Sequence, residues 1–184
     1  MSKILGEKFF QGKTLKIAQE LIGANLCRRI DKKVIKLPIA ELEAYDGFSD
    51  KASHASRGKT PRNFPMFESG GIWYVYFVYG NHWMLNIVTG TKDYPGAILI
   101  RGAGEIIGPG RLTKFLKIDK NFNSKPANKK TGLWIEKNNQ IKNLKIKKTP
   151  RIGVDYSGPV WSKKLYRFVL EKGKMKRKCR RFPM

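Results

Sequence analysis

The chain has 184 residues, and its 38 lysines and arginines against 14 aspartates and glutamates give a formal net charge of +24. This length fits one domain, and a hydrophobic content of 41% supports a core and argues against wholesale disorder. No apolar run approaches the ~20 residues of a membrane span, and the start MSKILGEKFF lacks the apolar core of a secretion signal. These features favour a nucleic-acid partner over a membrane. We expect an intracellular protein, in the cytoplasm or nucleoid, or in the nucleus if the source is a eukaryote.

The positive charge is concentrated in the second half of the chain. Residues 1–100 carry 14 basic and 9 acidic side chains, whereas residues 101–184 carry 24 basic and 5 acidic ones. Seven basic residues fall between Lys172 and Phe182. We therefore predict a domain over residues 1–171 that is followed by a basic C-terminal tail over 172–184.

The first predicted element is a helix that Thr14 caps and Gly23 ends, because the apolar residues between them follow helical spacing. Residues 26–30 and 34–45 then predict a β-hairpin across a polar turn. The segment 46–71 is rich in Gly, Ser, Pro and basic residues, which is typical of a long functional loop.

The remainder of the chain predicts mainly strands. The predicted strands cover residues 72–79, 83–89, 97–101, 132–146 and 151–156. A turn at Gly80-Asn81-His82 joins the first two of these strands, and a short amphipathic helix follows Gly108-Pro109-Gly110. Hairpins with few helices favour the α+β class with an antiparallel sheet.

Two of these strands carry polar or aromatic faces. Alternation places Glu41, Glu43 and Tyr45 on one face of their strand, and it places Tyr74 and Tyr76 together on one face of another. A lone acidic face is more often simply solvated, and aromatic stripes are more often core. In a strongly basic protein, however, tyrosines also suit stacking on nucleobases, worth about 1–3 kcal/mol each.

The sulfur and imidazole groups do not predict a metal centre. The spacing of the candidate ligands Cys27, Cys179, His54 and His82 does not favour a zinc site, and the sequence has no CxxC pair. Two distant thiols in an intracellular protein are most simply reduced and structural. We expect neither a metal nor a cofactor.

Several motifs in register resemble the alkyladenine DNA glycosylase family, also called 3-methyladenine or methylpurine DNA glycosylases. The motifs are ELEAYDG (41–47), SHASRGKTPRN (53–63), MF, WYVYFVYG (73–80), LNIV, AILIRG (97–102) and IGPGRL (107–112). The resemblance extends to FFQGKTLKIAQELIG (9–23) and RIGVDYSGPVW (151–161), so that it covers most of residues 9–118 and 151–168.

The resemblance implies a single compact α+β domain with a curved, mainly antiparallel β-sheet and a few peripheral helices. It implies a monofunctional, metal-free enzyme that works as a monomer on double-stranded DNA. The reaction would hydrolyse the N-glycosidic bond of alkylated or deaminated purines (3-methyladenine, 7-methylguanine, hypoxanthine) after nucleotide flipping, and would initiate base excision repair.

Carried over by position, Glu43 resembles the general base that activates water, and Arg101 resembles its companion near the water and the target phosphate. Hydrolysis at the anomeric carbon builds positive charge on the sugar. An adjacent carboxylate therefore helps twice, by accepting the proton of water and by stabilising that charge.

The resemblance also assigns the groups that would handle the base. Tyr45, His54 and Tyr76 would line the pocket and stack on the extruded purine. Tyr79 would insert into the duplex in place of that base. Asn86 would crowd the exocyclic amino group of guanine, so that intact guanine is refused.

The chain departs from the family pattern at the predicted hairpin tip, where Asn81 stands in place of an expected methionine beside Tyr79. Arg57, Lys59, Arg62 and Arg111 are candidates for phosphate contacts, although each is as readily a plain surface charge.

A second interpretation is a non-catalytic protein that binds RNA or single-stranded nucleic acid through the same basic surface and tyrosines. The strand 72–80 lacks the basic-Gly-aromatic order of the common RNA-recognition sheet. This alternative also gives no role to Glu43, Tyr45 and His54. The appearance of abasic sites in alkylated duplex DNA would discriminate the two.

Overall fold

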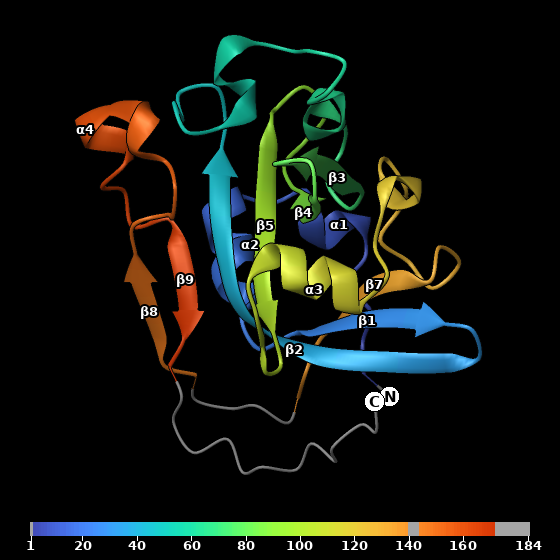
Figure 1. Cartoon of the computed structure of the whole chain (residues 1–184). Coiled ribbons are helices and arrows are strands. Elements are labelled where there is room, and N and C mark those ends of the chain that lie inside the picture. The colour runs from blue at the N-terminus through green and yellow to red at the C-terminus, as the bar shows by residue number, and fades with distance from the viewer. Residues whose placement is uncertain (1, 140–143, 172–184) are drawn as a thin grey trace.

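A bent antiparallel sheet organises the part of the chain that the computed structural model describes, residues 2–139 and 144–171 (Figure 1). The predicted tail at 172–184, which includes Cys179, lies outside these residues. The principal strands are β1 (Asn25–Ile30), β2 (Lys33–Asp46), β3 (Trp73–Val78), β4 (His82–Val88), β5 (Gly96–Ala103) and β7 (Leu133–Glu136). They follow the spatial order β3-β4-β5-β2-β1-β7, and their pairs are antiparallel. The predicted α+β class and the single domain with a mainly antiparallel sheet are confirmed.

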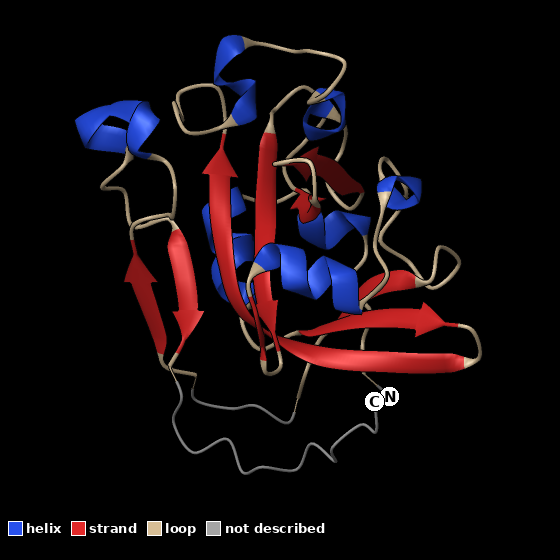
Figure 2. Cartoon of the chain, in the orientation of Figure 1, coloured by secondary structure: helices blue, strands red, loops and turns tan. Residues whose placement is uncertain are grey.

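Short strands and helices complete the fold (Figure 2). The strands are β6 (Ile106–Ile107), β8 (Ile146–Thr149) and β9 (Arg167–Leu170), and the helices are α1 (Glu7–Phe10), α2 (Thr14–Leu21), α3 (Pro109–Phe115) and α4 (Gly158–Trp161). The predicted loop 46–71 contains two 3-10 turns, His54–Arg57 and Phe64–Phe67. In Figure 1, α1 and α2 lie behind the sheet and α3 crosses in front of it.

The long strand β2 changes partners halfway along its length. Its first half pairs with β1 as far as Pro38, whereas its second half lies between β5 and β9. The register against β5 shifts between Ile39 and Leu42, and such bulges bend a strand and increase its twist. Pro38, which has no N–H to donate, stands just before this irregularity.

Alternation along the strands separates the core from a cavity. One face of β2, β3, β4 and β5 contributes Leu42, Ala44, Trp73, Val75, Leu85, Ile87, Ile98 and Ile100 to the main hydrophobic core. The other face of the same strands contributes Glu43, Tyr45, Tyr74, Tyr76, Met84, Asn86, Leu99 and Arg101 to the lining of a cavity. The period of two in these strands thus fixes which side chains face the core and which face the cavity.

Helix α2 packs its buried residues Ile17, Ala18 and Leu21 against the core. Thr14 is its first residue and not its cap, because Lys13 occupies the cap position. The Thr14 hydroxyl instead accepts a hydrogen bond from the Thr89 hydroxyl at 3.0 Å, which ties the start of the helix to the end of β4.

The prediction of a strand over residues 151–156 is wrong. Residues 155–157 form a 3-10 turn, and β8 pairs with β9, while β7 pairs with β1. The hydrogen-bonding groups of the segment are used elsewhere, since the Ile152 N–H donates to the side chain of Glu43. Strand β9 and helix α4 were not predicted. No helix in residues 2–139 or 144–171 is both long and apolar enough to cross a bilayer.

Candidate active site

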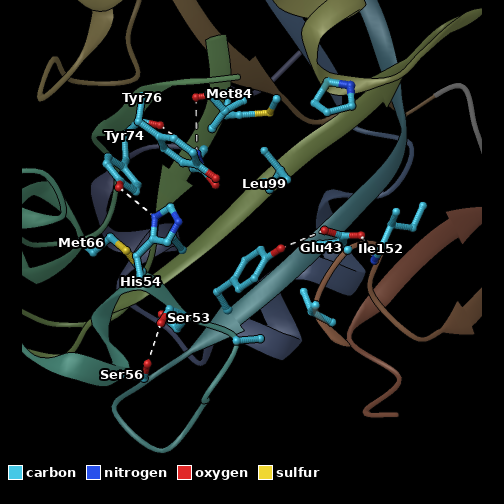
Figure 3. Close-up of a pocket in the computed structure, with 18 of the residues that line it drawn as sticks. Glu43, Ser53, His54, Ser56, Met66, Tyr74, Tyr76, Met84, Leu99 and Ile152 are labelled. Atoms are coloured by element: carbon cyan, nitrogen blue, oxygen red, sulfur yellow. Dashed lines mark hydrogen bonds between the residues drawn. The ribbon is translucent and has the colours of Figure 1, made fainter. Parts of the chain in front are cut away.

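A cavity of about 650 Å³ opens on the sheet face that lies opposite the core. Its floor comes from β2, β3, β4 and β5, and its sides come from residues 51–57 and 152–156 (Figure 3). The structure brings eight of the predicted site residues into its lining: Glu43, Tyr45, His54, Arg57, Tyr76, Tyr79, Asn86 and Arg101. Residues from four strands and two loops therefore meet at one place.

The Glu43 carboxyl is held at the bottom of the cavity by three neighbours. Oε1 accepts the Ile152 N–H at 2.8 Å and Oε2 accepts the Tyr45 hydroxyl at 3.0 Å. Arg101 Nη1 lies 3.4 Å from Oε1. A buried carboxylate needs such partners, because an isolated buried charge is costly. Glu43 is 0% exposed, so solvent meets its carboxyl only when a covering group moves.

Glu41 lies beside this group and binds two arginines. Its Oε1 accepts from Arg101 Nε and from Arg167 Nε, both at 2.8 Å. Burial raises the pKa of Glu41, but the hydrogen bonds from Arg167 and Arg101 outweigh it and leave the pKa below the ordinary value. Glu41 was placed on this face by alternation but was not predicted as a site residue.

An aromatic wall faces the carboxyl. The His54 and Tyr76 rings lie 4.8 Å apart between centroids, and Tyr74 and Tyr76 lie 4.9 Å apart. His54 Nδ1 is 3.1 Å from the Tyr74 hydroxyl. Burial, followed by the charge of Arg62, lowers the pKa of His54, so the neutral ring is favoured at neutral pH. Burial raises the pKa of Tyr74 to about 12, so its phenol stays protonated.

Asn86 is fixed within the sheet. It stands opposite Tyr74 in the β3–β4 pair and is 3% exposed. Its Nδ2 donates to the Tyr74 carbonyl oxygen at 3.0 Å. This bond orients the amide in the cavity wall, so Asn86 presents a rigid surface to whatever enters.

Tyr79 occupies the tip of the β3–β4 hairpin. The side chain is 90% exposed, although the tip residue belongs to the cavity lining. Tyr79 and Gly80 both have positive φ, 52° and 68°, and the Asn81 N–H closes the turn on the Val78 carbonyl. A left-handed conformation costs an ordinary L-residue about 1–2 kcal/mol. The turn therefore holds a large aromatic ring outward in a strained backbone.

The four phosphate candidates differ in their surroundings. Arg57 reaches the cavity lining. Lys59 lies over the Phe64 ring, 4.7 Å from its centroid, and Arg62 lies over the Tyr76 ring and donates to the Phe77 carbonyl. Arg111 is exposed on α3 and makes no ion pair with any described residue. The last three candidates are not among the residues that line the cavity.

An ion pair behind the cavity was missed by the sequence reasoning. Asp50 and Arg151 are fully buried, and Arg151 donates to both Asp50 carboxylate oxygens and to the Ala44 carbonyl. The guanidinium also lies 4.8 Å from the centroid of the Tyr45 ring. It thereby fastens the loop that carries Ile152, the residue whose N–H binds Glu43.

Tyr156 belongs to the same loop and lines the cavity. Its hydroxyl donates to the Ala52 carbonyl at 2.9 Å, which joins the two loops at the side of the cavity. Only the RIGVDY motif within the resemblance pointed to this segment. Among the described residues, no cluster of three or more His, Cys, Asp or Glu side chains is arranged to hold a metal ion.

Comparison with known proteins connects these features to one family. The profile described as methylpurine-DNA glycosylase matches residues 8–107 and 105–174. A protein of Borreliella afzelii is 38% identical over 183 residues, which cover 93% of this chain and 98% of the relative. A protein of Psychrobacter cryohalolentis is 34% identical over 188 residues, covering 86% and 88%. One of Methanocella arvoryzae is 38% identical over 176 residues, covering 84% and 86%. All three are named "Putative 3-methyladenine DNA glycosylase".

Proposed function

Because this chain belongs to the methylpurine-DNA glycosylase family, we propose that it is a monofunctional DNA glycosylase that releases alkylated or deaminated purines from double-stranded DNA. The proposed substrates are 3-methyladenine, 7-methylguanine and hypoxanthine, and the reaction starts base excision repair. The enzyme acts as a monomer. The observation that carries the proposal is a carboxyl, Glu43, at the bottom of a tyrosine-lined cavity in a protein of net charge +24.

In the proposed reaction Glu43 accepts a proton from water while the water oxygen bonds to the anomeric carbon. The bond from that carbon to the purine nitrogen breaks, and its electron pair leaves with the base. Positive charge on the sugar is greatest in the transition state, where the carboxylate stabilises it. Because Glu43 is covered in the free protein, the water takes the place of one covering contact, such as the Tyr45 hydroxyl, when the nucleotide enters.

Extrusion of the target nucleotide is the second part of the proposal. Unstacking costs a few kcal/mol and costs least for a weakly paired base. The ring of Tyr79 fills the vacated position, and Tyr45, His54 and Tyr76 stack on the extruded purine. Many alkylated purines are cationic, and a cation is attracted to the face of a tyrosine ring. Support comes from the meeting of all four residues at one cavity.

Selection against intact guanine is assigned to Asn86. Its amide is tied to the Tyr74 carbonyl, so the side chain gives way little when a purine amino group presses on it. Arg57, Lys59, Arg62 and Arg111 are proposed to contact phosphates. Binding to any duplex is then strongly weakened by salt.

The Glu43→Gln variant tests the proposal. Glutamine keeps the size of the side chain and removes the base, so release of hypoxanthine under single-turnover conditions is expected to fall by at least about 100-fold. Duplex binding, measured by fluorescence anisotropy, is expected to be unchanged. Glu20→Gln, on the exposed surface of α2, serves as the control. A Glu43→Gln enzyme that releases base as fast as the parent would contradict the mechanism.

The monofunctional character has a separate test. Lys51 is the lysine among the residues that line the cavity, and it is therefore the amine to test for a lyase reaction. We expect an intact DNA strand that breaks only after alkali treatment, and no covalent adduct with borohydride. Trapping of an enzyme–DNA adduct that Lys51→Gln abolishes would instead assign a lyase step.

A non-catalytic binder of RNA or single strands would use the same basic surface and tyrosines. This alternative function assigns no role to the buried Glu43 carboxyl and its three partners. The release of free base from alkylated duplex DNA decides between the two functions.

A further inference from the structure

Four charged side chains form an alternating chain that ends at the cavity. Arg167 on β9 binds Glu41 on β2, Glu41 binds Arg101 on β5, and Arg101 approaches Glu43 on β2. Arg167 also donates to the Thr149 hydroxyl on β8 at 3.2 Å, which anchors the outer end of the chain. The two members farthest from Glu43 along this chain, Glu41 and Arg167, do not belong to the cavity lining.

Arg101 is shared unequally between the two carboxyls. Its Nε lies 2.8 Å from Glu41, within the usual range for a charge-assisted hydrogen bond. Its Nη1 lies 3.4 Å from Glu43, which is longer than an ordinary N–H···O bond. Glu41 therefore holds the guanidinium at a distance from which it only partly neutralises Glu43.

Arg167 limits this effect from the other side. It contacts the same Oε1 atom of Glu41 as Arg101 does, and at the same distance of 2.8 Å. Because both arginines are cations beside one oxygen atom, Arg167 repels Arg101, and the net pull that draws Arg101 toward Glu41 is weaker than it would be without Arg167. Loss of Arg167 would strengthen the hold of Glu41 on Arg101, whereas loss of the Glu41 charge would release Arg101 toward Glu43.

We propose that Glu41 and Arg167 are positioning residues that set how strongly Arg101 neutralises Glu43, and thereby its strength as the general base. This inference rests on the proposed function of Glu43. Neither residue contacts the substrate in this scheme. They act through the position of Arg101, Glu41 by drawing it away from Glu43 and Arg167 by reducing that pull.

The other groups that face Glu43 are unchanged in variants of Glu41 and Arg167. Charged or titratable neighbours come from β2, β3, β5 and the loop that follows β8. Besides Arg101, they are Tyr45, Tyr76, Arg151 and Tyr156, together with the Ile152 N–H. On β9, Arg167 itself stands opposite Glu43 in the strand register. The groups that face Glu41 are Arg101 and Arg167.

The two variants have opposite predicted signs. In Glu41→Gln, Arg101 moves onto Glu43 and one nearby negative charge is lost. Both changes favour the ionised carboxylate, so the acidic limb of the pH–rate profile moves to lower pH. In Arg167→Gln, Arg101 is drawn further toward Glu41 and positive charge is lost, so the limb moves to higher pH. A shift of roughly one pH unit is expected in each case.

The measurement is single-turnover release of 7-methylguanine from a duplex between about pH 4 and about pH 8. This base leaves from a cationic nucleoside and needs no proton. His54 lines the cavity and titrates in the same pH range, but it is unchanged in these variants, so the shift of the acidic limb relative to the parent reports the general base. We also expect the plateau rate of Glu41→Gln to fall by about threefold to tenfold, because a more strongly neutralised carboxylate is a weaker base. Arg167→Lys is expected to restore the parent limb, since it keeps the charge.

The control is Glu136→Gln, which removes the carboxylate of the ion pair with Lys36 at the far end of the sheet and should leave the limb in place. The inference would be overturned if the acidic limb of the pH–rate profile does not move in Glu41→Gln and Arg167→Gln, or if it moves in the same direction in both. If Glu41→Gln does not fold, Arg167→Gln and Arg167→Lys still test the predicted sign. An active Glu43→Gln enzyme would refute the proposed function itself. An inactive Glu43→Gln with unmoved limbs would refute only the roles of Glu41 and Arg167.

Discussion

The two walls of the cavity are built in different ways. On the Glu43 wall, the carboxyl is held by Tyr45, Ile152 and Arg101, and buried ion pairs stand behind it. On the opposite wall, the rings of His54, Tyr74 and Tyr76 pack against one another, and a polar contact joins His54 Nδ1 to the Tyr74 hydroxyl. Under the proposed function, the carboxyl keeps one fixed orientation for the reaction, whereas recognition of several damaged purines relies on stacking surfaces.

The largest expected effect is on the stability of the Glu43 wall. Arg151→Met leaves Asp50 buried without its cation, and the free energy of unfolding should fall by about 3–5 kcal/mol. Lys16→Met breaks an exposed i,i+4 pair at 4.0 Å and should cost less than about 0.5 kcal/mol. Denaturant unfolding of both variants measures the contrast. Adding Asp50→Leu to Arg151→Met should recover part of the lost stability. Equally small effects of Arg151→Met and Lys16→Met would show that the buried ion pair does not stabilise the Glu43 wall.

The second prediction concerns the stacking wall. Tyr76→Leu removes an aromatic face next to His54 and Tyr74, and the loss of base stacking is expected to cost about 1–3 kcal/mol in nucleotide capture. Single-turnover release should therefore fall by about tenfold to 100-fold. Tyr76→Phe keeps the face and should stay within about threefold of the parent. If Tyr76→Leu and Tyr76→Phe release base at the same rate, stacking on the Tyr76 ring does not contribute to capture of the nucleotide.

The third prediction separates stability from function at the hairpin tip. Tyr79→Gly relieves the left-handed backbone and should raise the free energy of unfolding by about 1 kcal/mol. It should at the same time slow base release by roughly tenfold, since nothing fills the vacated stack. Tyr79→Ala keeps the strain and should lose only the release rate. A glycine variant that is less stable than the parent would show that the turn is not strained.

The smallest effect is a pH dependence of stability that His54 contributes. Its pKa is lowered in the folded protein, so the unfolded chain binds the proton more tightly. The unfolding free energy should therefore fall as pH drops below about 6.5, the ordinary pKa of histidine, and down through the folded value. His54→Gln should flatten this decline in unfolding measured between about pH 7.5 and about pH 5.5, above the range in which carboxyls titrate. A decline that is just as steep in the variant would contradict this assignment.

The sequence predicted the parts of the site that follow from local pattern. Alternation placed Glu43 and Tyr45 on one face of a strand, and the family motifs supplied Tyr79 and Asn86. Contacts between distant segments could not be read in this way. Asp50 and Arg151 are 101 positions apart, and no local rule pairs them.

The same limit explains the wrong strand. Residues 151–156 have the composition of a strand, but the Arg151 side chain is buried against Asp50 and the Ile152 N–H is bound to Glu43. Strand β9 occupies the edge of β2 next to this segment. Tertiary hydrogen bonds and competition between strands decided the outcome, and neither is visible in a window of a few residues.

If Tyr79 inserts into the duplex as proposed, its outward ring has a consequence for how this protein searches DNA. Because the backbone turn at the tip is formed before DNA arrives, only the side chain of Tyr79 has to be ordered at each attempt at insertion. A protein that slides along a duplex can then test successive base steps with a preformed probe. Weakly stacked steps would yield to it first, and the search would be governed by local duplex strength rather than by rearrangement of the protein.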